Sequence, residues 1–298
     1  MKEENKLVNK VKRLLRKAEM PRFLHHFGPK MYELWQHVFA LFFKTECRLS
    51  YRRTETLLKN LGFIVATKST IQRYAAKLDL PFWQILLNKT TSSVLSLAAI
   101  DGTCLERTNA SWHYIKRING RPPRLGYKLS ILSTRKKIIC IRLRAKPAHD
   151  IKDVKYILSK AKLKPKTLLM DKGYDAEWLH KYCHRNGINS IAPVRKGFSR
   201  GFHRKRLFAK FPQKLYNKRS SIVESMFHAL KQKFGATISS KHIGPARTEV
   251  YCRAILHNVF LIILQDLGQR TKKSKFEIRN YCIFPSKDLK EHREFRVS

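Results

Sequence analysis

Three acidic residues stand apart in a chain in which basic residues dominate: Asp101, Asp171 and Glu224. No Asp or Glu occurs in residues 107–149 or 178–223, although residues 107–149 contain twelve Lys and Arg. Carboxylates at the ends of buried strands and on a packed helix can converge on divalent cations, as a phosphoryl-transfer site requires. We therefore take the three acids as candidate metal ligands and catalytic residues.

The two aspartates each end an apolar run. Asp101 follows the run at 93–100, and Asp171 follows the run at 167–170. A glycine lies within two residues after each acid, and it allows the backbone to turn away and leave the carboxylate at the edge of a sheet. For either aspartate alone, a simple turn is the favoured explanation of the pattern.

The third acid, Glu224, lies in an amphipathic pattern that predicts a helix over 221–235. Lys231 falls two turns later on the same helical face. A Glu with a Lys above it can complete a metal site while the Lys holds a phosphate. The alternative is a solvent-exposed Glu–Lys face without a function, which is common at this spacing.

The composition indicates a polyanionic partner. The 298 residues include 63 Lys and Arg against 21 Asp and Glu, which gives a formal net charge of +42, and 43% are hydrophobic. Such a charge repels itself unless a polyanion neutralises it, and nucleic acid is the expected one. A solvated basic surface of the ribosomal-protein kind also implies nucleic acid, and a membrane surface is the weaker alternative. Without a signal-peptide pattern, we expect a cytoplasmic protein associated with DNA in the nucleoid.

Residues 1–88 have helical periodicity, and we expect them to form a small all-helical DNA-binding region. A helix-turn-helix is predicted at about 50–78, with Ser50 and Ser69 as helix N-caps. Its second helix carries Gln72 and Arg73, which would enter the major groove and contact bases. An ordinary helical hairpin without DNA contacts is the alternative.

The period changes after about residue 92, and the pattern predicts an α/β domain over 92–268. Strands are expected at 94–100, 112–118, 125–133, 138–145, 167–170 and 189–194, and helices at 150–161, 175–186, 221–235 and 245–266. This order describes a mixed sheet flanked by helices. Residues 269–298 read as a basic polar tail.

A strongly basic segment precedes the last acid. Residues 195–206 contain six Lys and Arg, including Arg204, Lys205 and Arg206, interleaved with phenylalanines. This composition favours a loop that follows a DNA backbone and stacks on unpaired bases. A solvated basic surface loop is the alternative.

Taken in order, these motifs resemble the DDE-type insertion-sequence transposases, in the group with a Tyr-Arg-Glu-Lys signature around the third acid. That signature matches Tyr216, Arg219, Glu224 and Lys231, and the segments around Asp101 and Asp171 match as well. His149-Asp150 and Asn258 resemble further family features. Four residues separate Arg219 from Glu224 where the signature has three, so either Lys218 or Arg219 is a candidate for the arginine role.

The resemblance implies an RNase H-like catalytic core in which Asp101, Asp171 and Glu224 hold two Mg²⁺ or Mn²⁺ ions. Tyr216, Arg219 and Lys231 would contact DNA near the cut. The expected function is a transposase that binds the ends of an insertion sequence, cleaves double-stranded DNA and joins it to a target, as a homodimer on DNA. A nuclease or resolvase on the same fold is the alternative enzyme, and a domesticated DNA-binding regulator is the alternative without catalysis.

Overall fold

The computed structural model describes residues 4–24, 27, 30–91, 95–107, 126–146, 148–195, 200–240 and 242–271. Residues 1–259 form one compact unit, and residues 260–298 form a second. The second unit is described only over 260–271, which continue a helix that begins in the first unit. Over the described ranges, no helix combines the length and the apolar character needed to cross a lipid bilayer.

The first part of the chain is helical, as its periodicity predicts. Its helices are α1 (Glu4–Lys17), α2 (Leu34–Glu46), α3 (Tyr51–Asn60), α4 (Lys68–Lys77) and α5 (Leu80–Lys89). Helices α3 and α4 pack against each other across a short turn, at the position predicted for the helix-turn-helix. Ser50 caps α3 by accepting a hydrogen bond from the backbone N–H of Arg53. The prediction of Ser69 as an N-cap is wrong, because α4 begins earlier and Thr67 occupies the capping position.

The remainder of the first unit is built on a mixed sheet. Its strands are β1 (Leu97–Arg107), β2 (Gly126–Ser133), β3 (Ile138–Arg144), β4 (Thr167–Met170), β5 (Asn189–Ile191) and β6 (Thr237–Ile238). The order is β3-β2-β1-β4-β5, with β6 paired to the far end of β1. Strand β2 is antiparallel to β1, whereas β4 and β5 are parallel to it. This confirms the expected mixed sheet flanked by helices.

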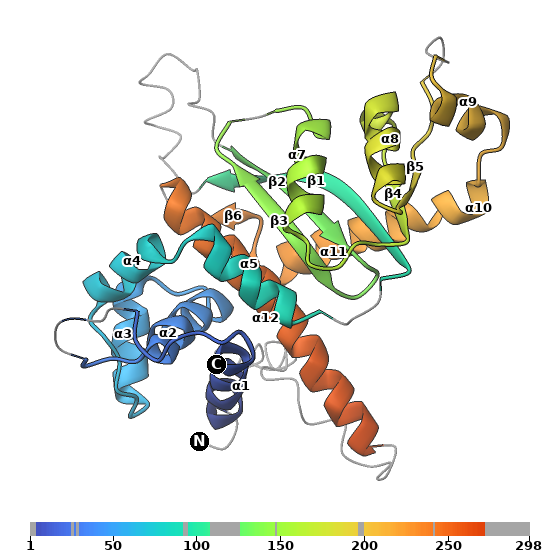
Figure 1. The fold of residues 1–298 in the computed structure, drawn as a ribbon. Helices are drawn as coiled ribbons and strands as arrows, with labels where there is room; N and C mark the ends of the chain where they lie inside the picture. The colour runs from blue at the N-terminus through green and yellow to red at the C-terminus, as the bar shows by residue number, and fades with distance from the viewer. Residues whose placement is uncertain are drawn as a thin grey trace, which may run out of the picture. The chain divides into compact units, whose positions relative to one another are not determined.

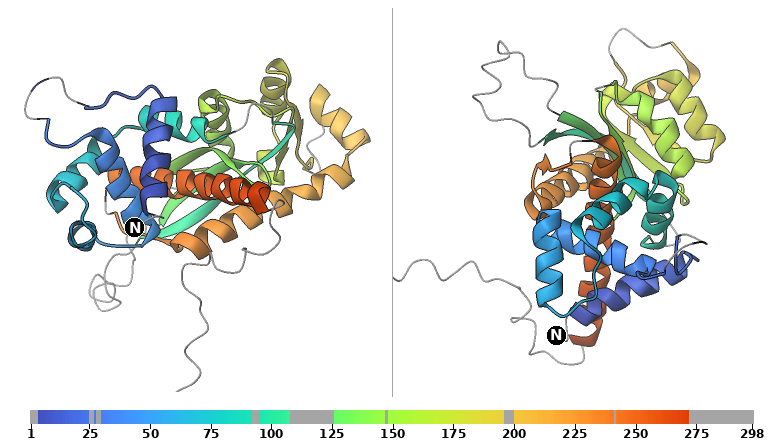
Figure 2. Two further views of the ribbon diagram at one scale, coloured as in Figure 1. Left: turned by 90° about the horizontal axis from the view of Figure 1, so that it is seen from below. Right: turned by 90° about the vertical axis from the view of Figure 1, so that its left-hand side faces the viewer.

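Helices cover both faces of this sheet (Figures 1 and 2). The helices of this part of the chain are α7 (Ile151–Lys160), α8 (Glu177–Arg185), α9 (Phe202–Ala209), α10 (Gln213–Tyr216), α11 (Lys218–Phe234) and α12 (Ile243–Thr271), of which α9 packs on α8 and α10 on α11. Helices α7 and α8 pack on one face, over a core that includes Ala98, Ile100 and Met170. Helix α11 packs against β1 and β2, and it lies on the opposite face (Figure 1). Because side chains alternate along a strand, β1 directs Ala98 and Ile100 to one face and Asp101 and Thr103 to the other.

The free edge of β3 is covered by side chains from two helices. Asn258 of α12 accepts a hydrogen bond from the backbone N–H of Ile138 and donates to the carbonyl of the same residue. Gln84 of α5 donates to the carbonyl of Ile139, and Tyr251 of α12 donates to that of Ile141. These bonds satisfy an exposed sheet edge that would otherwise pair with another strand. Asn258 is therefore fully buried and has a structural role.

Three predictions need correction or fall outside the structure. Strand β1 runs on to Arg107, beyond the predicted end at residue 100, because β2 and β6 both pair with its second half. The segment 195–206 is not a loop throughout, because α9 begins at Phe202. The strand predicted at 112–118 lies outside the described residues.

Candidate active site

Two of the three predicted acids lie next to each other on the adjacent inner strands β1 and β4, at the point where β4 ends. Ile100 of β1 is the register partner of Met170 of β4, and the next residues are Asp101 and Asp171. Strand β4 ends at Met170, so Asp171 leaves the sheet, whereas Asp101 stays within β1. The parallel pairing thus brings together two carboxylates that are 70 positions apart in the sequence.

Asp101 is half-buried and holds two hydrogen bonds. One carboxylate oxygen, Oδ1, accepts from the backbone N–H of Gly102 at 2.8 Å. The other, Oδ2, accepts from Nη1 of Arg219 at 2.8 Å. Burial raises the pKa of Asp101, and these two donors oppose the shift without cancelling it.

Arg219 joins the two acids. Its Nη2 lies 3.7 Å from Oδ1 of Asp171, while Nη1 binds Asp101. The guanidinium therefore faces both carboxylates. Between the two candidates for the arginine role, Lys218 and Arg219, it is Arg219 that contacts the aspartates.

A second basic residue of α11 reaches the same strand. Lys231 donates a hydrogen bond from Nζ to Oγ1 of Thr103 at 3.0 Å. Thr103 lies two residues after Asp101 and therefore on the same face of β1. Helix α11 thus contacts this edge of the sheet through Arg219 near its start and Lys231 near its end.

Glu224 is not in contact with the aspartates. It is an exposed residue of α11, between Arg219 and Lys231, on the same helical face as Lys231. Among the described residues, no hydrogen bond or ion pair of Glu224 is found, and no three His, Cys, Asp or Glu are grouped closely enough to hold a metal ion. The structure thus brings together Asp101, Asp171, Arg219 and, through Thr103, Lys231.

Asp150 is a neighbouring acid whose surroundings the sequence did not predict. It forms an ion pair with Lys128 of β2. A Cβ atom at Gly102 would lie 2.7 Å from Oδ1 of Asp150, so the residue after Asp101 must be small for this carboxylate to approach. The His149-Asp150 motif was the only sequence signal for this position.

Tyr174 lies beneath the acids. The short 3₁₀ helix Lys172–Tyr174 follows Asp171 and turns the ring of Tyr174 into the core, where it is 1% exposed. Burial is the main cause that raises the pKa of Tyr174, and the charges of Asp150 and Asp101 add to it. Tyr174 is therefore a neutral group that supports the site from below.

Tyr216 lies beside the site, in α10, two residues before the first residue of the helix that carries Arg219. Its ring contacts Phe211 edge to face, with centroids 5.2 Å apart. Burial raises the pKa of Tyr216, so its hydroxyl is protonated at neutral pH and available as a hydrogen-bond donor. It is close to the acids without a direct bond to either carboxylate.

The three DNA-contacting residues predicted in the basic segment 195–206 differ in exposure: one is buried and two are exposed. Arg204 is 8% exposed and binds Asp175 through two hydrogen bonds of 2.8 and 2.6 Å. Its guanidinium is occupied within the protein, so a DNA contact from Arg204 stays a prediction that requires this ion pair to open. Lys205 and Arg206 are exposed on α9.

The predicted base-reading residues lie on an open surface. Gln72 and Arg73 are exposed on α4, whose opposite side buries Ile71 and Ala75. Arg73 donates to the hydroxyl of Thr70 at 3.3 Å and forms no ion pair among the described residues. Both side chains are therefore accessible to a ligand on this face of α4.

Comparison with known proteins gives a family for most of this unit. The family model of the transposase DDE domain matches residues 92–260. A cryo-EM structure of a piggyBac transposase synaptic complex with hairpin DNA is 10% identical, with 89% of this chain and 73% of that chain covered and a TM-score of 0.49. A Mos1 strand transfer complex is 14% identical, with 85% and 80% covered and a TM-score of 0.23. Curated proteins give no match.

Proposed function

Because the chain belongs to the transposase DDE domain family and is a DNA transposase that cleaves and joins DNA strands, we propose that the sheet edge with Asp101 and Asp171 is its catalytic centre. The observation that carries this proposal is the β1–β4 register, which sets the two carboxylates side by side with Arg219 facing both. A nuclease that only cuts and a regulator that only binds DNA lack the family's joining reaction.

The donor set fits divalent metal ions. Hard cations such as Mg²⁺ and Mn²⁺ prefer carboxylate oxygens, and two carboxylates here share a single guanidinium. We propose that Asp101, Asp171 and Glu224 hold two such ions, with Glu224 provided by the face of α11 that also carries Lys231. When bound, the ions activate the attacking water or 3′-hydroxyl and stabilise the leaving oxygen.

The basic residues of α11 have complementary roles. Arg219 neutralises the aspartates, and its guanidinium would bind a phosphate beside the scissile bond. Lys231, fixed by Thr103, holds a second phosphate near the same strand. Tyr216 donates its hydroxyl hydrogen to DNA near the cut and is not a nucleophile.

DNA is bound over a wider surface. In this proposal Gln72 and Arg73 of α4 read bases at the ends of the insertion sequence, and Lys205 and Arg206 of α9 bind the backbone. The net charge of +42 supports a double-stranded DNA partner. Since two element ends must be paired for joining, the active form is a homodimer on DNA, in the cytoplasm and on the nucleoid.

The test is cleavage and joining of a labelled duplex carrying the DNA that flanks the coding sequence, with Mg²⁺ or Mn²⁺. Asp171→Asn should lose several kcal/mol of transition-state stabilisation, which is a fall of roughly 10³-fold in rate, while DNA binding is kept. Asp79→Asn is the matched control, because Asn caps α5 as well as Asp does. Near-normal cleavage by Asp171→Asn would remove that residue from the site.

Base reading by α4 is tested separately. Replacing Gln72 and Arg73 by Ala should reduce discrimination between the flanking duplex and random DNA, at roughly 1–3 kcal/mol for each base contact. Arg185→Ala on the exposed surface of α8 controls for the lost charge. Unchanged discrimination in a competition assay would place end recognition elsewhere in the chain.

A further inference from the structure

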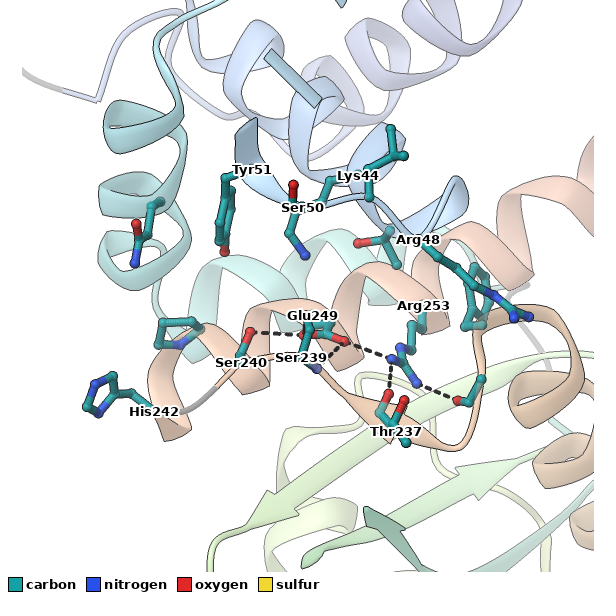
Figure 3. Close-up of a pocket in the computed structure, with 16 residues that line it drawn as sticks. Lys44, Arg48, Ser50, Tyr51, Thr237, Ser239, Ser240, His242, Glu249 and Arg253 are labelled. Carbon is teal, nitrogen blue, oxygen red and sulfur yellow. Dashed lines mark hydrogen bonds and ion pairs between the residues drawn. The ribbon is translucent and has the colours of Figure 1, made fainter. Parts of the chain in front are cut away.

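A pocket lies between the helical region and the corner formed by α11, β6 and α12, away from the paired aspartates. Its volume is about 630 Å³. Ser50 and Tyr51 line it from one side, and Ser240, Glu249 and Arg253 line it from the other (Figure 3). Gln72 of the proposed base-reading helix also lines this pocket.

The pocket is cationic, because its single carboxylate is already in use. Glu249 accepts hydrogen bonds from Ser239 at 3.0 Å, Ser240 at 2.9 Å and Arg253 at 2.7 Å. Burial alone would raise the pKa of Glu249, but the charges of Arg253 and Lys44 and the hydrogen bonds from Ser240 and Ser239 together outweigh it and lower that pKa. Glu249 is therefore a charged, fully engaged acid that holds Arg253 in the wall.

Two cationic side chains of the wall, Arg253 and Lys44, are engaged to different extents. Nε of Arg253 is buried and bonds to nothing in the described parts of the chain, although the side chain is only 8% exposed. Lys44 is 7% exposed, and its ammonium lies 4.8 Å from the ring centroid of Tyr51. Lys44 forms no ion pair with a carboxylate of the described residues. A buried donor left unsatisfied, such as Nε of Arg253, costs about 1–3 kcal/mol. A nearly buried ammonium without a carboxylate partner, as at Lys44, leaves a position for an anionic acceptor.

Two helices also begin at this pocket. Helix α3 starts at Tyr51 and α12 starts at Ile243, and both first turns contribute to the lining. Helix N-termini carry a partial positive charge of about half an elementary unit and free N–H groups, which favour anions. Tyr51 and Phe234 add ring surfaces beside these charges.

We propose that this pocket binds a phosphate group, and that this group is a backbone phosphate of the same DNA whose bases α4 contacts. The proposal rests on the proposed function, since it places one strand between the base-reading helix and the catalytic sheet. Lys44 supplies the charge, because the guanidinium of Arg253 is held by Glu249 and by the carbonyls of Gly235 and Thr237, and the aromatic walls accept the adjoining sugar. The pocket therefore holds bound DNA in register between recognition and cleavage.

The test compares Lys44→Gln with Lys160→Gln, which removes the same charge from the exposed end of α7. Binding of one duplex DNA is measured over a range of salt concentrations. Lys44→Gln should flatten the slope of log affinity against log salt by about 0.9, the value for one phosphate contact. Lys160→Gln should leave the slope unchanged, and Lys44→Arg, which keeps the charge, should restore it.

A second measurement identifies the source of the phosphate. Without DNA, an excess of inorganic phosphate that raises the melting temperature of the wild type but not of Lys44→Gln would assign the pocket to a free phosphate. Equal slopes for Lys44→Gln and Lys160→Gln together with no stabilisation by phosphate would overturn the proposal. Failure of the wild type to bind DNA would instead count against the proposed function.

Discussion

Two aspartates of this protein each bind an arginine from another segment, but in different surroundings. The side chain of Asp175 is 0% exposed, and the side chain of its partner Arg204 is 10% exposed. At the candidate active site, Asp101 is 24% exposed and the adjacent Asp171 is 49% exposed, around Arg219. The same chemical pair therefore closes one region and leaves the other open to solvent and to ligands.

The closed region fixes α9 to Asp175 and to the start of α8. Besides Arg204, Asp175 accepts a hydrogen bond from the backbone N–H of Arg195 at 2.9 Å. Glu177 accepts from the first backbone N–H groups of α9, those of His203 and Arg204, at 3.1 Å each. Gly201 before α9 has a φ of +110°, and a Cβ there would collide with Glu177. The difference teaches that only the open pair has carboxylate oxygens that a cation can reach.

The largest expected effect is on the free energy of unfolding, which should distinguish the Asp175–Arg204 pair from the Asp101–Arg219 pair. Arg204→Ala leaves Asp175 charged and buried, so the free energy of unfolding should fall by about 3–5 kcal/mol. Arg219→Ala leaves solvent-accessible carboxylates, and its cost should be near the ~0–1 kcal/mol of an exposed pair. Urea unfolding of both variants measures the difference. Equal losses would show that exposure does not distinguish the two regions.

A smaller effect concerns the neighbours of Arg204. Replacing Lys205 and Arg206 by Gln should flatten the salt dependence of DNA binding by about 1.8, or two phosphate contacts. Replacing Arg204 as well should add nothing to the slope, because its guanidinium is held by Asp175. The matched control is the pair Lys160→Gln and Lys162→Gln on an exposed surface. A loss equivalent to three contacts in the triple variant would show that the buried pair opens on DNA.

The smallest effect is a pH dependence at the open site. Burial raises the pKa of Asp101 above its ordinary value of 3.8. The folded state therefore holds this proton to a higher pH than the unfolded chain. The protonated Asp101 carboxyl contributes to the free energy of unfolding. This contribution is fully present below the pKa that Asp101 has in the unfolded chain, and it is lost as pH rises through the raised pKa of the folded state.

Asp101→Asn lacks this loss, so its stability relative to the wild type should improve as pH rises through that range and stay constant above it. Unfolding by urea at a series of pH values measures the trend. A relative stability that does not change with pH would contradict the raised pKa. Asp79→Asn, at an exposed helix cap, is the control.

Much of the fold follows from local pattern. The predicted strands at 125–133, 138–145 and 167–170 match β2, β3 and β4 within one residue, because apolar alternation and burial are local properties. The start of α9 at Phe202 was not predicted, since its residues show no apolar stripe and its start depends on Glu177. The extension of β1 to Arg107 depends on pairing with distant strands.

The sequence alone was enough to predict that Asp171 follows a buried strand, that Asp101 follows a buried apolar run, and that a basic chain with these motifs is a transposase of the DDE kind. Only the tertiary structure decided which cations remain available, because an ion pair depends on where distant segments meet. Arg204 meets an aspartate 29 positions away and Arg219 meets one 118 positions away. With 63 Lys and Arg in the chain, nothing local distinguishes these two from the rest.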